Sequence, residues 1–227
     1  MSLPTLSGKR ILVTQSEAFM GATLCRVLAE WGAEVIADPR PLADPALPAE
    51  LVRAAGRVDV LIANLAVPAA STRAVDVEDD EWRDTFAHVV DPLPRLARAV
   101  LPQMVERRAG KILVMGSAAA LRGMKRTSSY SAARGAQLAW AQAVGIEMAP
   151  NKVQVNAVAQ NFVDNPTYFP AEVQANPAFQ ERLKREVPLG RLVSPDEDAQ
   201  FVAYLCSDAA NCFVGQIFPV SGGWATK

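Results

Sequence analysis

The segment LVTQSEAFMGATL, Leu12–Leu24, decides the fold, because a short apolar run meets a helical pattern within a few residues. The run ends in Thr14, and apolar residues recur with helical spacing from Gly21 onward. A strand that turns directly into a helix is the unit from which parallel α/β sheets are built. Glycines in such a turn let backbone N–H groups cradle a phosphate. In this chain Gln15 and Phe19 stand in the turn instead.

The composition of the 227-residue chain indicates an ordinary soluble globular protein. Hydrophobic residues make up 50% and charged residues 21%, and the formal net charge is −1 with no basic or acidic block. This charge gives no support to binding of nucleic acid or a membrane surface. The amino terminus lacks the apolar core of a signal peptide, and no apolar run approaches about 18 residues. We therefore expect a cytoplasmic protein.

The cysteines and the histidine argue against metal and redox sites. Cys25, Cys206 and Cys212 lie in apolar surroundings without CxxC spacing, so we expect reduced, structural thiols. His88 is the only histidine, which excludes a multi-histidine metal site. The amphipathic helical pattern around His88 favours a structural role for it.

Strand-like and helix-like segments alternate along the chain. The strand-like runs are rich in Val, Ile and Leu, as expected for strands buried on both faces of a parallel sheet. They span Arg10–Thr14, Glu34–Ala37, Val58–Ala63, Lys111–Met115, Val153–Val158 and Gln216–Val220. The helical patterns span Gly21–Trp31, Pro48–Ala55, Glu78–Arg107, Ser128–Met148, Pro177–Val187 and Ser194–Ser207. This alternation predicts an α/β fold with a doubly wound parallel sheet flanked by helices.

Prolines predict two irregularities in this sheet. The long Glu78–Arg107 pattern should be interrupted around Asp91–Pro94, since a proline ends or kinks a helix. Segment Pro39–Pro48 is proline-rich and too short for a regular βα unit. We therefore expect one edge strand of the usual sheet to be reduced or missing.

Three polar residues indicate chemistry at the carboxyl edge of the sheet. Ser117 falls just after a predicted strand, where open α/β sheets place ligands. Tyr130 and Arg134 are four residues apart at the start of a predicted helix, so both project from one face. An adjacent cation lowers the tyrosine pKa of ~10 by about 1–3 units. Tyr130 is thus a candidate base for a weakly acidic alcohol, although a turn cap, packing and a surface ion pair are the structural alternatives.

The chain resembles the short-chain dehydrogenase/reductase family along nearly its whole length. The dinucleotide loop of that family reads Thr-Gly, three residues, Gly, one residue, Gly. Here Thr14 matches, while Gln15 and Phe19 replace the first two glycines. The remaining Gly21 is the one needed for packing helix on strand. Phe19 would put a ring where the pyrophosphate lies, and Glu17 a negative charge near it, which argues against nucleotide binding.

An arginine in the active-site helix makes the resemblance more specific. The family's oxidoreductases carry lysine where this chain has Arg134. Arginine there, combined with the pattern Thr, four residues, Phe-x-Gly over Thr14–Gly21, resembles the halohydrin dehalogenases, a cofactor-free branch of the family. The resemblance extends to VPLGRL (Val187–Leu192) and SGGW (Ser221–Trp224).

This resemblance implies a redox-neutral reaction without cofactor or metal. Tyr130, assisted by Arg134, would take the proton of a vicinal haloalcohol while Ser117 holds the oxygen. The alkoxide then displaces halide to form an epoxide, and the reverse reaction opens epoxides with azide, cyanide or nitrite. The resemblance also implies a single Rossmann-like domain over residues 1–227 and a cytoplasmic homotetramer.

The departing halide would be held by a loop with backbone N–H groups and apolar walls. The matching stretch here is AQNFVDNPTYF, Ala159–Phe169. Glutamine stands where some relatives carry proline, which leaves the shape of the pocket open. The halide-binding role is carried over to Asn161, Phe162 and Val163, with Gln160 at the edge and Phe19 as a wall.

Two other functions stay open at this point. An NAD(P)-dependent alcohol dehydrogenase is favoured by Asp38, placed to hold the NAD ribose, and by the retained Ser117 and Tyr130. It is opposed by the filled loop and by Arg134. Asp38 could equally cap its own loop. A non-catalytic binding protein derived from a dehydrogenase is the second alternative.

Overall fold

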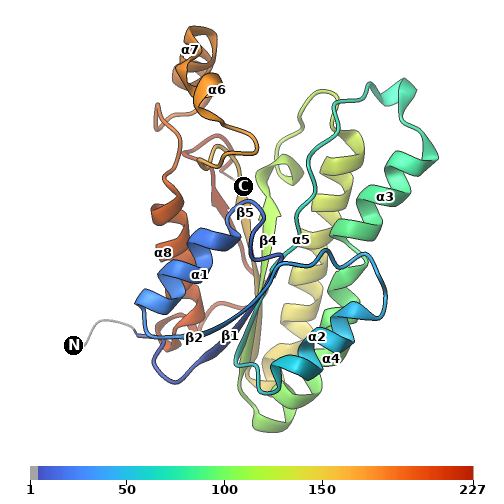
Figure 1. Ribbon diagram of the computed structural model, residues 1–227, viewed down its shortest axis with the longest axis vertical. Helices are drawn as coiled ribbons and strands as arrows, with labels where there is room; N and C mark the ends of the chain where they lie inside the picture. The colour runs from blue at the N-terminus through green and yellow to red at the C-terminus, as the bar shows by residue number, and fades with distance from the viewer. Residues whose placement is uncertain (1–4, 227) are drawn as a thin grey trace.

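The computed structural model describes residues 5–226 and centres on one six-stranded parallel sheet (Figure 1). The strands lie in the order β2-β1-β3-β4-β5-β6. They span β1 Arg10–Thr14, β2 Glu34–Asp38, β3 Val60–Asn64, β4 Gly110–Ser117, β5 Val153–Gln160 and β6 Ile217–Val220. Each predicted strand-like run therefore contributes one strand, and the predicted α/β fold is confirmed. Residues 1–4 and 227 of the predicted domain lie outside the described residues.

Helices cover both faces of the sheet. One face carries α1 and α8, which pack against each other, and the other carries α2, α4 and α5, with α3 packed on α4 and α5. None of the helices within residues 5–226 is both long and apolar enough to cross a membrane. The helices span α1 Gly21–Glu30, α2 Leu47–Ala55, α3 Asp79–Val89, α4 Pro92–Arg107, α5 Ser128–Met148, α6 Ala171–Ala175, α7 Pro177–Glu186 and α8 Pro195–Cys206. Short 3-10 turns lie at Ala74–Asp76, Ala118–Ala120, Ala149–Asn151 and Asp208–Ala210.

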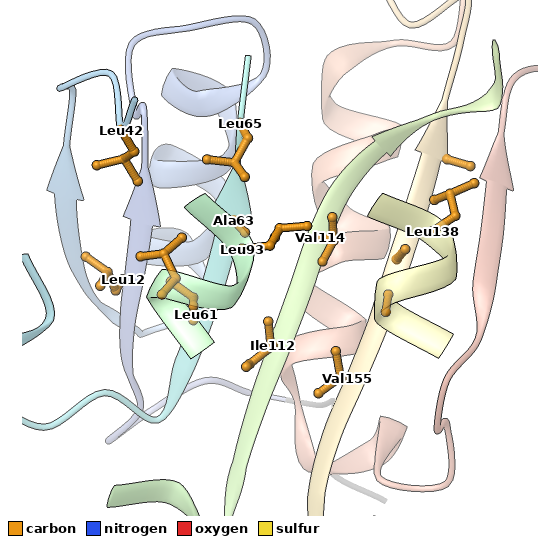
Figure 2. Close-up of a cluster of buried hydrophobic side chains, with 14 of the residues drawn as sticks. Leu12, Leu42, Leu61, Ala63, Leu65, Leu93, Ile112, Val114, Leu138 and Val155 are labelled. Atoms are coloured by element: carbon orange, nitrogen blue, oxygen red, sulfur yellow. The ribbon is translucent and has the colours of Figure 1, made fainter. Parts of the chain in front are cut away.

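The core explains why the strands are apolar throughout. All five residues of β3 are buried, because each face of the strand meets a helix layer. Figure 2 shows the larger layer, in which Leu61 and Ile112 from neighbouring strands lie with Leu93 of α4, while Leu138 of α5 covers the β5 side. Alternate residues of the same strands, such as Ile62, pack on α1 and α8.

Regular secondary structure is interrupted by prolines at the two predicted places. The Glu78–Arg107 pattern divides into α3 and α4, with Pro92 at the first position of α4, where its missing N–H costs nothing. Between β2 and α2 the chain forms no strand, so the sheet ends at β2. Two details were not predicted. Ser117 is the last residue of β4 rather than lying beyond it, and α6 has no counterpart among the predicted helices.

The strand order creates the crevice that holds the candidate site. The chain passes from β1 to β2 on one side and then returns to β3 on the other side of β1. Open α/β sheets bind ligands outside the carboxyl ends of strands at such a reversal. At this point the Asn64 side chain, at the end of β3, donates 3.0 Å hydrogen bonds to the carbonyls of Gln15 and Ala18. The loop after β1 is thereby fixed over the crevice.

Gly21 is required by close packing rather than by an unusual backbone. A Cβ at this position would lie 2.5 Å from the carbonyl carbon and oxygen of Ser16 and 2.8 Å from the carbonyl oxygen of Gln15. These are backbone atoms of the β1–α1 turn and have little room to move. The one glycine kept from the family's loop is thus the one on which the packing of α1 depends.

We predict that Gly21→Ala lowers the free energy of unfolding by about 1–3 kcal/mol through overpacking. Gly135→Ala is the matched control, because nothing lies within 4 Å of a Cβ there. That change should stabilise the protein by up to about 1 kcal/mol, since glycine weakens a helix interior. Chemical denaturation of both variants measures the difference, and equal stabilities would contradict the packing argument.

Candidate functional site

A cavity of about 250 Å³ opens at the carboxyl ends of β1, β4 and β5. Every site residue predicted from the sequence lines it. These residues are Phe19, Ser117, Tyr130, Arg134, Gln160, Asn161, Phe162 and Val163. The tertiary structure thus brings together residues from four separate segments of the chain.

Ser117 and Tyr130 face this cavity from neighbouring elements. Ser117 ends β4, and its Oγ accepts a hydrogen bond from the Ala119 N–H at 3.2 Å. That contact uses a lone pair of the serine and leaves its hydroxyl proton for a ligand oxygen. Tyr130 lies in the first turn of α5, so its ring reaches the cavity from the adjacent helix.

Arg134 is a buried cation without a carboxylate partner. Its side chain is 5% exposed, and its guanidinium lies 5.0 Å from the centroid of the Tyr130 ring. Nη1 donates to the carbonyl of Met115 at 3.1 Å and to Oε1 of Gln137 at 2.9 Å, while Nε has no partner. Among residues 5–226 no ion pair neutralises this charge. A buried charge without compensation is costly, so an anion beside Arg134 would be stabilised.

The Tyr130 hydroxyl is the ionisable group best placed to become that anion. Burial raises the pKa of Tyr130, but the charge of Arg134 and polar interactions with Ser117, Arg134 and Tyr168 together outweigh burial. The resulting pKa of Tyr130 lies below the usual value for tyrosine. At a given pH a larger fraction of Tyr130 is therefore ionised than of a free tyrosine, and the phenolate is the form that can accept a proton from an alcohol.

The loop after β1 keeps a glycine-type backbone although its glycines are gone. Gln15 has φ 44° and Phe19 has φ 48°, in the left-handed region that costs a residue with a Cβ roughly 1–2 kcal/mol. The Asn64 hydrogen bonds to this loop offset that strain. The Gln15 side chain is buried and accepts a hydrogen bond from the Ala66 N–H at 2.5 Å. Side chains thus fill the turn, and Phe19 lines the cavity as predicted.

Asp38 is engaged by its own loop. The Arg40 backbone N–H donates to Asp38 Oδ1 at 2.9 Å, and the Arg40 guanidinium donates to both carboxylate oxygens at 2.8–3.2 Å. This favours loop capping over a ribose-binding role. With Gln15 and Phe19 in the phosphate turn and Glu17 exposed beside it, these residues do not fit a dinucleotide.

The loop after β5 presents fewer free backbone donors than the sequence led us to expect. The Asn161 N–H donates to the carbonyl of Val220 at 3.0 Å, and the Phe162 N–H donates to Asn161 Oδ1 at 2.9 Å. Both groups are therefore used within the protein. The second bond fixes the Asn161 amide so that Nδ2 remains available, with only Met124 Sδ at 3.8 Å as a weak acceptor. Asn161 is thus better placed to bind an anion through its side chain than through its backbone.

The charge around the cavity also suits an anion. Arg134 and Arg182 line it, with Arg182 Nε paired to Glu186 Oε2 at 3.1 Å, and none of the lining residues is Asp or Glu within the part of the chain that the structure describes. The Arg182 guanidinium lies 5.4 Å from the centroid of the Phe162 ring, so it remains beside the anion loop. Aromatic rings of Phe19, Phe162 and Phe169 supply the apolar wall.

Gln160 is tied to a buried carboxylate. Its Nε2 donates to Oδ2 of Asp198 at 2.5 Å, while Oδ1 of Asp198 has no partner and the side chain is fully buried. Burial raises the pKa of Asp198 to about 6, although the Gln160 hydrogen bond lowers it. The glutamine that replaces an expected proline therefore has a partner of its own in α8.

The structure also places the residues whose roles were open. His88 Nδ1 lies 2.9 Å from the carbonyl of Asp84 on α3 and does not line the cavity. Trp224 is buried within the subunit, with its ring 5.9 Å from that of Phe162 and 4.9 Å from the Arg122 guanidinium. Within residues 5–226 no three His, Cys, Asp or Glu side chains are grouped to hold a metal ion.

Tyr168 and Arg182 are two lining residues that sequence reasoning missed. The Tyr168 hydroxyl accepts a hydrogen bond from the Ala69 N–H at 2.9 Å and lines the cavity together with Tyr130. The signal that could have found Tyr168 was its place in the segment already assigned to the anion loop.

Comparison with known proteins agrees with this fold. Residues 43–225 match the family described as Enoyl-(Acyl carrier protein) reductase, and the chain belongs to the short-chain dehydrogenase/reductase family. It is 31% identical to the 2-keto-3-deoxy-L-fuconate dehydrogenase of Xanthomonas campestris, over 99% of this chain and 84% of that protein.

Two solved structures resemble this one closely. A protein described as a dehalogenation enzyme is 31% identical, with a TM-score of 0.90 over 97% of this chain and 99% of its own. A halohydrin dehalogenase bound to ethyl (2S)-oxiran-2-ylacetate is 26% identical, with a TM-score of 0.89 over 96% and 98% of the two chains. An L-sorbose reductase of Gluconobacter frateurii, solved with NADPH and L-sorbose, shares the fold equally well, with 22% identity and a TM-score of 0.90 over 98% of each chain. Structural neighbours therefore include both dehalogenases and oxidoreductases, and the fold alone does not separate the two classes.

We predict that Asp198 makes stability depend on pH. Its carboxyl keeps a proton up to about pH 6 when folded but ionises near pH ~4 when unfolded, so stability falls as pH rises between those values. The wild type should therefore lose up to about 3 kcal/mol of unfolding free energy from this carboxyl between pH 4 and pH 7. Asp198→Asn lacks the carboxyl, so its unfolding free energy should rise by that amount relative to the wild type over the same range. Denaturant unfolding across this range measures it.

Asp80→Asn serves as the control, because the Asp80 side chain is 95% exposed and should leave the pH dependence nearly unchanged. Parallel pH curves for Asp198→Asn and the wild type would show that Asp198 is ionised in both states.

Proposed function

We propose that this protein is a halohydrin dehalogenase, which converts vicinal haloalcohols into epoxide, halide and a proton without a cofactor. The observation that carries this proposal is the buried, carboxylate-free Arg134 beside Tyr130, in a cavity whose nucleotide turn is filled by Gln15 and Phe19. A phenolate stabilised by a fixed cation can abstract a proton from an alcohol whether or not a hydride acceptor is bound. The two dehalogenase structures among its neighbours support the same reaction class.

The proposed reaction begins with proton transfer. Ser117 donates a hydrogen bond to the substrate oxygen, and the Tyr130 phenolate takes the hydroxyl proton. The resulting alkoxide attacks the adjacent carbon in line, the carbon–halogen bond breaks, and its electron pair leaves with the halide. Holding oxygen and carbon in attack geometry is the main help that a protein gives to an intramolecular displacement.

The departing halide develops its negative charge on the other side of the cavity. Asn161 Nδ2 and the Arg182 guanidinium are the groups placed to stabilise that charge, with Phe19, Phe162 and Val163 as apolar walls and Gln160 at the edge. The same groups would hold azide, cyanide or nitrite for the reverse opening of an epoxide. We expect the enzyme to act as a cytoplasmic homotetramer, as the family resemblance implies.

The purified protein, with no added cofactor, should release halide and protons from a small vicinal bromo- or chloro-alcohol. Tyr130→Phe removes the base and should lower the rate by about 10²–10⁴-fold, as expected for loss of general base catalysis. Tyr204→Phe is the matched control, since the Tyr204 hydroxyl lies near the carbonyl of Ala209, outside the cavity. Undiminished halide release by Tyr130→Phe would refute the assignment of the base.

A dehydrogenase is the second candidate, because the sequence relatives named above are oxidoreductases. It requires a dinucleotide in the turn that Gln15 and Phe19 fill. We predict no saturable binding of NADH or NADPH at micromolar concentrations, measured by fluorescence titration or calorimetry. Restoring the turn with Gln15→Gly and Phe19→Gly together should increase nucleotide affinity. Tight binding by the unmodified protein would favour the dehydrogenase.

A further inference from the structure

The hydrogen bonds of Tyr168 determine where its hydroxyl proton points. The backbone N–H of Ala69 donates to Tyr168 Oη at 2.9 Å and so occupies one of its lone pairs. The carbonyl of Val67 lies 3.5 Å from the same oxygen. An O–H···O hydrogen bond is strongest near ~2.8 Å, so this carbonyl is a poor acceptor. The hydroxyl proton of Tyr168 is therefore available to another oxygen.

Tyr130 Oη, which belongs to the same cavity, is the phenol oxygen that can accept this proton. The two tyrosines line the same cavity, and interaction with Tyr168 is among the causes that lower the pKa of Tyr130. The reciprocal effect appears on Tyr168, whose pKa is raised first by burial and next by the neighbouring Tyr130. Of the two phenols, Tyr130 thus has the lower pKa and loses its proton first as the pH rises.

The Tyr168 ring is held rigidly in this orientation. Its backbone N–H donates to Oδ1 of Asn165 at 2.9 Å, and its ring lies 5.2 Å from the ring of Phe19. Phe19 therefore has a second role beyond filling the nucleotide turn, because its ring packs against the ring of Tyr168. The contact to Ala69 also ties the loop after β3 to the loop after β5 across the cavity.

We propose that Tyr168 is a positioning residue that donates a hydrogen bond to the Tyr130 phenolate, with the Ala69 N–H holding its hydroxyl in place. Its bearing on catalysis rests on the proposed dehalogenase function, whereas the hydrogen bond itself does not. The phenolate oxygen is then stabilised by the Arg134 guanidinium and the Tyr168 hydroxyl, while the Ser117 hydroxyl is kept for the substrate oxygen. The ionisable side chains lining the cavity from all elements are Tyr130, Tyr168, Arg134 and Arg182.

The direct test is carbon-13 NMR of tyrosines labelled at Cζ, which reports phenol ionisation without any substrate. The chain has three tyrosines, so single Tyr→Phe variants assign every resonance. Tyr168→Phe keeps the ring but removes the donor, and the pKa of Tyr130 should rise by about one unit. Tyr204→Phe, the control, should leave the Tyr130 titration unchanged.

A reciprocal measurement keeps the test valid if Tyr168→Phe folds poorly. In Tyr130→Phe the neighbouring phenolate is gone, so the pKa of Tyr168 should fall relative to the wild type. An unchanged Tyr130 titration in folded Tyr168→Phe would overturn the proposal, as would an unchanged Tyr168 titration in Tyr130→Phe.

Activity separates this inference from the proposed function. If the protein releases halide, the rise of kcat/KM with pH should move to higher pH in Tyr168→Phe by the same amount as the NMR titration. A merely structural role for Tyr168 would lower the rate without moving this profile, and that result would overturn the positioning role. If no haloalcohol is turned over but the NMR titration shifts, the hydrogen bond stands and the proposed function fails.

Discussion

The arrangement of the site depends on a guanidinium that is buried with no carboxylate partner among residues 5–226. Arg134 receives fixed hydrogen-bond acceptors from Met115 and Gln137, but these carbonyl oxygens carry no net charge. The positive charge therefore favours any anion that forms beside it, and the Tyr130 hydroxyl is the nearest group that can ionise. Arginine cannot release its own proton in a protein, so it acts only as a fixed charge. Arg134 can therefore stabilise a phenolate that abstracts a proton without itself taking part in proton or hydride transfer.

The turn after β1 keeps the backbone conformation of a phosphate-binding loop, but its side chains fill the phosphate space and shape the neighbouring cavity. Gln15 and Phe19 keep left-handed backbone angles that glycine would adopt at lower cost. Asn64 holds the carbonyls of this turn, and the Gln15 side chain binds the Ala66 N–H. The backbone scaffold of a phosphate-binding turn is thus retained while its space is occupied. The Phe19 ring gains a contact with Tyr168, so occupation of the turn also shapes the cavity beyond it.

Much of the fold could be predicted because its strands are buried on both faces. Continuous runs such as RILVT in β1 leave little ambiguity, and prolines mark the break before α4 and the shortened edge of the sheet. The short helix α6 was not predicted, because five residues carry too little periodicity to be distinguished from a loop. Ser117, Tyr130 and Arg134 were predicted by their positions at a strand end and a helix start, which parallel topology brings together. Phe19 and residues 160–163 were instead carried over from the family resemblance.

The sequence by itself determined the alternation of strands and helices, the filled turn and the pairing of tyrosine with arginine on one helix face, because these depend on residue type and spacing. Only the tertiary structure decided that Arg40 engages Asp38, that Gln160 binds the buried Asp198 and that Tyr168 lines the same cavity as Tyr130. It also decided that the Asn161 and Phe162 N–H groups are used within the protein. Such pairings depend on distances between side chains and backbone groups, which local sequence patterns do not encode.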